Sequence, residues 1–294
     1  MEEIIKVSHL KKNFGKTTAL SDVTFTVNAG EVVGFIGPNG AGKSTTIRTL
    51  LGIIEKSGGQ ATIFNKDVWK ESLAIHEKIS YVPGDVALWG NLTGGEIIDL
   101  FMSLHGHGDK KQRDYLIKRF ELDPKKKAKS YSKGNRQKVG LIAALSVASE
   151  LYIFDEPTSG LDPLMEAVFQ EEVAKLKQAG KAILLSSHIL SEVEHLADKV
   201  VIIRQGKVVE SGTLDELRHL TRSTFTVRTK DDVTQLKTLA GVYDFVVKDN
   251  EAKFSADNTQ MNAILLAATK LTVEKFEVTP PTLEDLFMRH YQGV

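Results

Sequence analysis

The segment GPNGAGKST has the residue types and spacing needed to bind a phosphate group. An apolar run before it predicts a buried strand (Glu31 to Gly37), and the residues after it predict the first turns of a helix. Glycines let such a loop turn tightly, so that successive N–H groups and the helix start point at one anion. Lys43 adds a positive charge for the β- and γ-phosphates, and the Ser44 hydroxyl can bind Mg²⁺. The spacing therefore predicts a nucleotide-binding loop made of Gly37, Pro38, Asn39, Gly40, Ala41, Gly42, Lys43, Ser44 and Thr45.

Two adjacent acids follow a second apolar run, LYIF. The pattern predicts a buried parallel strand whose carboxyl end presents Asp155 and Glu156, where an open α/β sheet places its ligands. We expect Asp155 to hold Mg²⁺, directly or through water, and Glu156 to polarise an attacking water. After a phosphate-binding loop, two such acids complete a nucleotide hydrolase.

Two further side chains are candidates for the same site. His188 follows the apolar run AILLSS, which predicts another strand of the sheet, and from there it could reach the γ-phosphate. A purely structural histidine is the alternative. Phe14 lies in the turn-like segment KNFGK, where its ring could stack on a nucleotide base or could be an ordinary hairpin aromatic.

Composition limits the class of protein. The chain has 294 residues, which suggests a main domain and a smaller appendage. Its 38 basic and 38 acidic residues balance, which argues against a dedicated nucleic-acid-binding protein. The absence of cysteine excludes disulfides and thiolate metal sites. We find no secretory signal and no apolar stretch long enough to cross a bilayer, so we expect a soluble protein whose membrane role would come through a partner.

The order of predicted elements divides the chain at residue 220. In residues 1–220, segments that alternate apolar and polar residues come first and predict strands of an antiparallel sheet. A helical insert occupies about residues 90–149 and includes an apolar helix predicted from Leu141 to Ser149. Residues 221–294 predict the order β-α-β-β-α-β of a ferredoxin-like α+β domain, with a last helix from Pro281 that has Thr282 or Glu284 near its start. This tail carries no catalytic pattern, and we expect it to regulate the protein or to contact a dimer partner.

Taken together, the motifs of residues 1 to about 220 resemble the nucleotide-binding subunit of ATP-binding cassette (ABC) transporters. The resemblance implies an α/β P-loop NTPase cassette with an antiparallel β subdomain and a helical subdomain, and it implies ATP and Mg²⁺ as cofactors. Phe14 lies where that family stacks adenine, His188 lies at its switch histidine, and Ser159 to Asp162 match its dimer-spanning loop. Lys43, Glu156 and His188 are then the expected catalytic residues.

The sequence YSKGN (Tyr131 to Asn135) lies where the family has its LSGGQ signature. The resemblance implies that two cassettes join head to tail, so that Ser132 and the N–H of Gly134 hold the γ-phosphate of ATP bound by the partner, with Asp162 at the shared site. It also implies a membrane-embedded permease as a second partner and a peripheral place on the cytoplasmic face of a bacterial membrane. The tail resembles cassettes of export systems in which ATPase and membrane protein are separate chains.

Two positions depart from the family pattern. Lys133 stands where the signature usually has Gly, which adds a cation near the expected phosphate. Gly84 stands where the family has a Gln that touches Mg²⁺ and the attacking water. The neighbouring Asp85 could take over part of that role as a metal ligand, or it could be a simple turn residue.

Two other functions stay open from the residues. The first is a cassette protein that acts on ribosomes or DNA, but such members usually carry two cassettes or a long coiled coil. The second is a regulatory module that binds ATP without turnover, against which Glu156 and His188 both argue.

Overall fold

The computed structural model describes residues 2–106, 108–219 and 222–280. The chain divides into two compact units, Met1–Ser211 and Gly212–Val294. The boundary between these units therefore precedes the one expected from the sequence, after residue 220. The last helix predicted from Pro281 lies outside the described residues.

A ten-stranded sheet forms the centre of the first unit, in the order β5-β4-β1-β2-β10-β9-β3-β8-β7-β6. Its strands are β1 (Glu3–Phe14), β2 (Thr17–Asn28), β3 (Val32–Ile36), β4 (Gly58–Ile63), β5 (Lys66–Asp67), β6 (Ile79–Val82), β7 (Leu151–Asp155), β8 (Ala182–Ser187), β9 (Lys199–Arg204) and β10 (Lys207–Thr213).

The sheet has an antiparallel part and a parallel part. β1 pairs antiparallel with β2 and with β4, as the alternation near the N-terminus predicts. β3 lies parallel to β8 and β9, β7 lies parallel to β8, and β6 lies parallel to β7. The segments that follow β3, β6, β7 and β8 therefore leave the sheet at one edge, which is where a parallel α/β sheet places its ligands.

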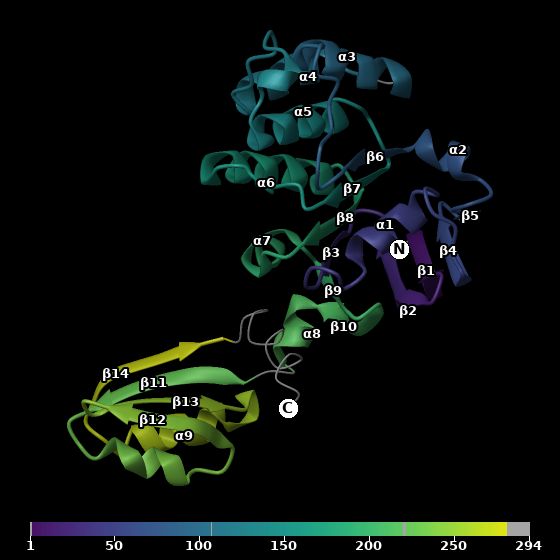
Figure 1. Ribbon diagram of the computed structural model, residues 1–294. Coiled ribbons are helices and arrows are strands. Elements are labelled where there is room, and N and C mark those ends of the chain that lie inside the picture. Colours follow the sequence, from purple (N-terminus) through teal and green to yellow (C-terminus); the bar gives the residue numbers. More distant parts are fainter. Residues whose placement is uncertain (1, 107, 220–221, 281–294) are drawn as a thin grey trace. The chain divides into compact units, whose positions relative to one another are not determined.

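Helices surround this sheet (Figure 1). They are α1 (Lys43–Leu50), α2 (Ser72–His76), α3 (Gly94–His105), α4 (Lys110–Arg119), the short 3₁₀ helix η1 (Ala128–Ser130), α5 (Lys133–Leu145), α6 (Pro163–Gln178) and α7 (Leu190–Leu196). The predicted helical insert is present as α3, α4 and α5, which lie together beyond β6 (Figure 1). The helix predicted around residues 141–149 begins earlier and ends at Leu145, where the next residue, Ser146, donates its hydroxyl to the Ile142 carbonyl at 2.6 Å.

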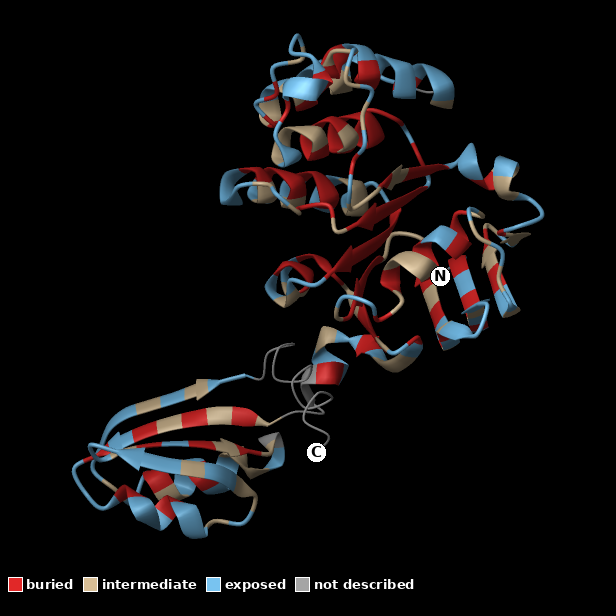
Figure 2. Cartoon of the chain, in the orientation of Figure 1, coloured by how far each residue is buried: buried red, intermediate tan, exposed pale blue. Residues whose placement is uncertain are grey.

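The parallel strands β3, β7 and β8 are buried along their length, which explains their apolar runs (Figure 2). On one side of the sheet Phe35 stacks on Phe25 with ring centroids 5.2 Å apart, within a core that includes Ile47 and Leu50 of α1. This packing fixes the start of α1 against the end of β3, and so it fixes the loop that joins them.

The second unit contains a four-stranded sheet in the order β12-β13-β11-β14. Its elements are α8 (Leu214–His219), β11 (Ser223–Thr229), η2 (Val233–Thr238), β12 (Val242–Lys248), β13 (Glu251–Ala256), η3 (Asn258–Gln260), α9 (Met261–Ala268) and β14 (Val273–Thr279). The predicted ferredoxin-like order is confirmed, although the first predicted helix is the 3₁₀ helix η2. Phe225 stacks on Phe254 at 5.4 Å in a core separate from that of the first unit.

Candidate functional site

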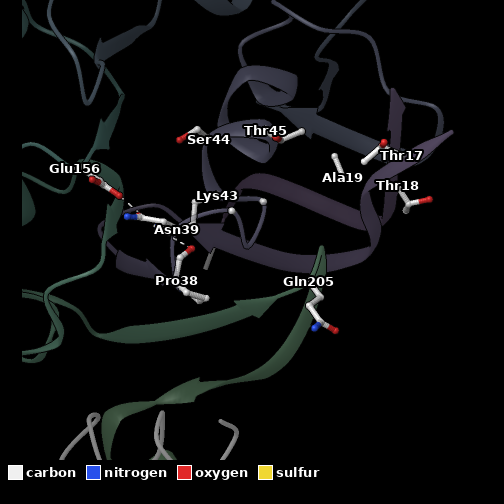
Figure 3. Close-up of a pocket in the computed structure, with 12 residues that line it drawn as sticks. Thr17, Thr18, Ala19, Pro38, Asn39, Lys43, Ser44, Thr45, Glu156 and Gln205 are labelled. Atoms are coloured by element: carbon white, nitrogen blue, oxygen red, sulfur yellow. Dashed lines mark hydrogen bonds and ion pairs between the residues drawn. The ribbon is translucent and has the colours of Figure 1, made fainter. Parts of the chain in front are cut away.

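The loop between β3 and α1 borders a cavity of about 470 Å³ (Figure 3). Gly42 precedes α1 with φ 114°, a conformation that favours glycine, and it offers no side chain to cap the helix. The first N–H groups of α1 therefore have no capping side chain, which makes this helix start suited to an anion. Of the predicted loop, the residues that line the cavity are Pro38, Asn39, Gly40, Gly42, Lys43, Ser44 and Thr45.

Two residues of the predicted loop lie behind it. Ala41 is 3% exposed and its carbonyl accepts a hydrogen bond from the N–H of Gly206 at 2.8 Å. A Cβ on Gly37 would lie 2.3 Å from the carbonyl oxygen of Ile203. Both residues thus anchor the loop to the segment from Ile203 to Gly206 rather than facing a ligand.

Lys43 begins α1 and is 5% exposed. Its Nζ donates to the carbonyl oxygen of Gly37 at 2.7 Å and lies 3.4 Å from Oε1 of Glu156. The ammonium group is therefore held at the mouth of the loop between backbone carbonyls and a carboxylate, and Figure 3 shows it pointing toward Glu156.

Glu156 follows β7 with a left-handed backbone, φ 50°. A non-glycine residue in this region is strained, and such strain is concentrated at functional sites. Its N–H donates to the Ser186 carbonyl at 3.0 Å, and its Oε2 lies 3.3 Å from Nδ1 of His188. The structure therefore brings together the three predicted catalytic residues, Lys43, Glu156 and His188, from three different elements.

Asp155 ends β7 and is 6% exposed. Its Oδ1 accepts a hydrogen bond from the Ser186 hydroxyl at 2.5 Å. Sequence reasoning missed Ser186, although two serines at the end of an otherwise apolar strand are a signal that polar groups are needed there. On β6, burial, and then the charge of Asp155, raise the pKa of Tyr81 to about 12, so this phenol stays neutral beside the acid.

The predicted signature residues lie at the start of α5. Ser132 caps the helix by accepting a hydrogen bond from the N–H of Asn135 at 3.3 Å. A Cβ on Gly134 would lie 2.3 Å from the Gly160 carbonyl oxygen, so the close approach of these two segments requires glycine. Lys133 donates to the Ser159 hydroxyl at 2.7 Å. The signature thus packs against the turn after Glu156 and does not line the cavity of its own chain.

Asp162 lies at the other end of that turn. It is exposed and caps α6 by accepting a hydrogen bond from the N–H of Met165 at 3.0 Å. Its place within its own chain is therefore that of a helix cap.

The structure does not bring Phe14 into the lining of the cavity. Its ring is 50% exposed at the end of β1, and the Lys12 ammonium lies 4.8 Å from the ring centroid. The cavity is bordered instead by Thr17, Thr18 and Ala19 of the next strand and by Gln205 (Figure 3). Sequence reasoning missed these residues, because nothing in their local pattern indicates a ligand.

The loop after β6 reaches the same edge of the sheet. A Cβ on Gly84 would lie 3.1 Å from the Asp155 carbonyl oxygen and 3.6 Å from Cβ of Glu156. Asp85, the next residue, is exposed. Within the described ranges, no group of three His, Cys, Asp or Glu side chains is arranged to hold a metal by itself.

The arrangement has the parts that phosphoryl transfer to water needs. A helix start and a lysine can bind phosphate oxygens, and a carboxylate beside a histidine can orient a water. None of the helices that the structure describes is long and apolar enough to span a membrane.

Comparison with known proteins agrees with this geometry. The profile of the ABC transporter family matches residues 20–159, and that of the C-terminal domain of DrrA1-3-like ATP-binding proteins matches residues 212–291. The chain is 32% identical to the linearmycin resistance ATP-binding protein LnrL of Bacillus subtilis (strain 168), over 97% of each chain. It is also 32% identical to the bacitracin transport ATP-binding protein BcrA of Bacillus licheniformis, over 100% of this chain and 99% of the relative.

Among solved structures, an ATP-binding subunit of an ABC transporter is similar, with a TM-score of 0.69 and 34% identity over 74% of this chain and 92% of that one. The match to full-length relatives covers both units, and the fold and site geometry agree with a cassette. The chain therefore belongs to the ABC transporter family, as an ATP-binding subunit that hydrolyses ATP to drive transport.

Proposed function

We propose that this chain powers a bacterial exporter from the cytoplasmic face of the membrane, through ATP-dependent head-to-tail pairing of two cassettes. The observation that carries the proposal is the convergence of Lys43, Glu156 and His188 within 3.4 Å contacts at one cavity. The two relatives described above are named for linearmycin resistance and for bacitracin transport, which favours a small-molecule cargo of this kind.

Head-to-tail pairing is supported by the place of the signature. Ser132 is exposed and Gly134 is partly exposed at the start of α5, and neither lines the cavity of its own chain. In a pair, the start of α5 and the Ser132 hydroxyl would face the γ-phosphate of ATP bound by the partner. The Lys133–Ser159 hydrogen bond would couple binding of that phosphate to the position of the turn that follows Glu156.

Mg²⁺ fits the oxygen ligands present. The Ser44 hydroxyl lines the cavity, and the Ser186 bond engages only Oδ1 of Asp155, so that Oδ2 stays outside that bond. Hard oxygen donors of this kind, with phosphate and water, are what Mg²⁺ takes in proteins. When bound, the ion would neutralise charge on the phosphates, while Glu156 orients the attacking water and His188 holds Glu156 and the γ-phosphate in place.

A permease would dock on an apolar groove beside β6. This groove has a volume of about 300 Å³ and is lined by side chains that include Tyr81, Val86, Leu88, Phe101 and Ala144. The exposed ring of Trp89 extends the apolar surface and lies 6.0 Å from the Phe101 ring. Such a groove suits a short amphipathic helix.

The docking model is tested with Phe101→Asp in the ATPase–permease complex. We expect ATP hydrolysis by the isolated chain to stay unchanged and stimulation by the permease to be lost, because a charge would be buried in the apolar contact. Leu266→Asp is the matched control, since Leu266 is 66% exposed and lies in the second unit. Full stimulation in the Phe101 variant would rule out this groove as the docking site.

Asp85 is our candidate to replace part of the missing glutamine. It directly precedes Val86, which lines the groove, and directly follows Gly84, which abuts Asp155. We expect Asp85→Ala to lower the permease-stimulated rate and to weaken the Mg²⁺ dependence of the stimulation. Mg²⁺ titrations of wild type and variant, alone and in the complex, measure this. Identical curves with full stimulation would leave Asp85 as a turn residue.

The second unit has an accessory role in this proposal. The residues assigned to the nucleotide site and those that line its cavity all lie in the first unit, and the core around Phe225 is separate. Regulation or contact with a dimer partner is the function that we assign to it.

A further inference from the structure

Glu192 is a buried acid that the nucleotide site does not yet account for. It lies in the first turn of α7 and is 5% exposed. A carboxyl group is seldom buried without a partner that requires it. The segment that carries His188 joins β8 to this helix. Glu192 therefore follows a candidate catalytic residue closely in the sequence.

Its hydrogen-bond partner is Ser187, the residue directly before His188. Oε2 of Glu192 accepts a hydrogen bond from the Ser187 hydroxyl at 2.7 Å. The same hydroxyl oxygen accepts a hydrogen bond from the N–H of Ile189 at 3.0 Å. Ile189 provides no side-chain cap for α7. Glu192 thus fixes the Ser187 hydroxyl, and that hydroxyl closes a tight turn around His188.

Glu192 also lies beside the turn that follows Glu156. Thr158 is 4% exposed, and its carbonyl accepts a hydrogen bond from the N–H of Leu161 at 2.9 Å. Thr158 and Glu192 border one cavity of about 280 Å³, together with Glu166 of α6. One buried carboxyl therefore lies between the segment that carries His188 and the turn that carries Glu156.

The Glu192 carboxyl group is incompletely hydrogen-bonded. Burial raises the pKa of Glu192 above its ordinary value and Glu166 adds to that rise, whereas the hydroxyls of Ser187 and Thr158 and the charge of His188 lower it. Among the described residues, Oε1 has no partner at full hydrogen-bond geometry. A buried carboxyl with one unpaired oxygen costs stability. Replacing Glu192 should therefore lower the activity without a matching fall in the melting temperature.

We infer that Glu192 is a positioning residue, which holds His188 against Glu156 through the Ser187 hydroxyl. The inference rests on the proposed roles of Glu156 and His188. Without Glu192, the turn from Ser187 to Ile189 loses its anchor, and the 3.3 Å contact between His188 Nδ1 and Glu156 Oε2 is no longer fixed. Binding of ATP at Lys43 does not involve Glu192, so the effect should fall on kcat and leave KM in place.

The test is a double-mutant cycle on the full chain, with steady-state ATP hydrolysis and thermal melting as readouts. We expect Glu192→Ala to lower kcat at least about tenfold with KM unchanged. His188→Ala should lower kcat by about 100-fold or more. Because Glu192 acts through His188, the double variant should be no slower than His188→Ala alone. Glu192→Gln, which keeps an oxygen for the Ser187 hydroxyl, should restore most of the rate.

Three further variants make the outcome decisive. Ser187→Ala should reproduce Glu192→Ala and should fold even if the glutamate variant does not. Glu194→Ala makes the same truncation on the same helix and should leave kcat unchanged. If His188→Ala and Glu156→Gln lose activity but neither Glu192→Ala nor Ser187→Ala does, the inference is wrong and the proposed function stands. Additive losses in the double variant, with a matching fall in melting temperature, would also overturn it. Undiminished hydrolysis in Glu156→Gln would instead refute the proposed function itself.

Discussion

Replacing Lys43 by alanine should abolish ATP turnover, with a loss of at least about 100-fold in the rate of phosphate release. The Lys43 ammonium is the side-chain cation held at the mouth of the loop, by the Gly37 carbonyl at 2.7 Å and Glu156 at 3.4 Å. Its removal takes away the charge that binds the β- and γ-phosphates. It also leaves the Glu156 carboxylate facing the incoming phosphates without its lysine partner, so nucleotide affinity should fall as well.

Binding of a fluorescent ATP analogue and steady-state phosphate release measure both effects. Lys78→Ala is the matched control, because Lys78 also pairs with a glutamate, Glu150, at 3.0 Å, but on the exposed surface. That variant should keep both affinity and rate. A Lys43→Ala protein that hydrolyses ATP at a near-normal rate would place the nucleotide site elsewhere in the chain.

The parts of the site that are contiguous in sequence could be predicted from it. The phosphate-binding loop, the acids Asp155 and Glu156 and the histidine after β8 each combine an apolar strand with a polar end. Because parallel strands present their carboxyl ends at one edge, the meeting of Lys43, Glu156 and His188 followed from sheet topology once the strands were recognised. The βαββαβ order of the tail could be predicted because strands and helices repeat their apolar residues with different periods.

The parts that the sequence could not give depend on contacts between distant segments. Ser186 holds Asp155 across two neighbouring strands, and Gln205 reaches the cavity from the end of β9. Neither residue type carries a pattern of its own. The sequence allowed Phe14 to be either a base-stacking ring or an ordinary hairpin aromatic, and in the structure its exposed ring lies under Lys12, outside the lining of the cavity. A hairpin's twist and side-chain packing decide such a position, and local sequence encodes neither.

Element ends were the other limit. The apolar run after Leu141 favoured a helix to Ser149, yet α5 ends at Leu145, where Ser146 turns its hydroxyl back to the Ile142 carbonyl. A serine hydroxyl competes with the helix backbone for hydrogen bonds. The spacing of apolar residues carries no information about that competition. Glu192 was missed for a related reason, because a charged residue in a helical pattern is read as exposed until its burial is known.

Replacing Glu156 by glutamine should separate binding from hydrolysis. The amide has nearly the shape of the carboxylate, so Lys43 keeps its place and ATP should still bind. The amide cannot accept a proton from the attacking water, and general-base catalysis of this kind is worth about 10²- to 10⁴-fold. We therefore expect hydrolysis to fall by at least about 100-fold, with the ATP-bound state accumulating. Glu150→Gln, at the other end of β7, is the matched control and should hydrolyse ATP normally.

The accumulated state should be a head-to-tail dimer. With ATP intact, the γ-phosphate stays bound to the Ser132 hydroxyl and to the start of α5 in the second chain. These contacts keep the two cassettes together. Size-exclusion chromatography with light scattering in Mg-ATP should show a dimer for Glu156→Gln and a monomer without nucleotide. Adding Ser132→Ala to Glu156→Gln should weaken the dimer while leaving ATP bound, because Ser132 does not line the cavity of its own chain. A Glu156→Gln chain that stays monomeric at saturating ATP would show that the isolated subunit does not pair in this way, and it would leave pairing to the permease.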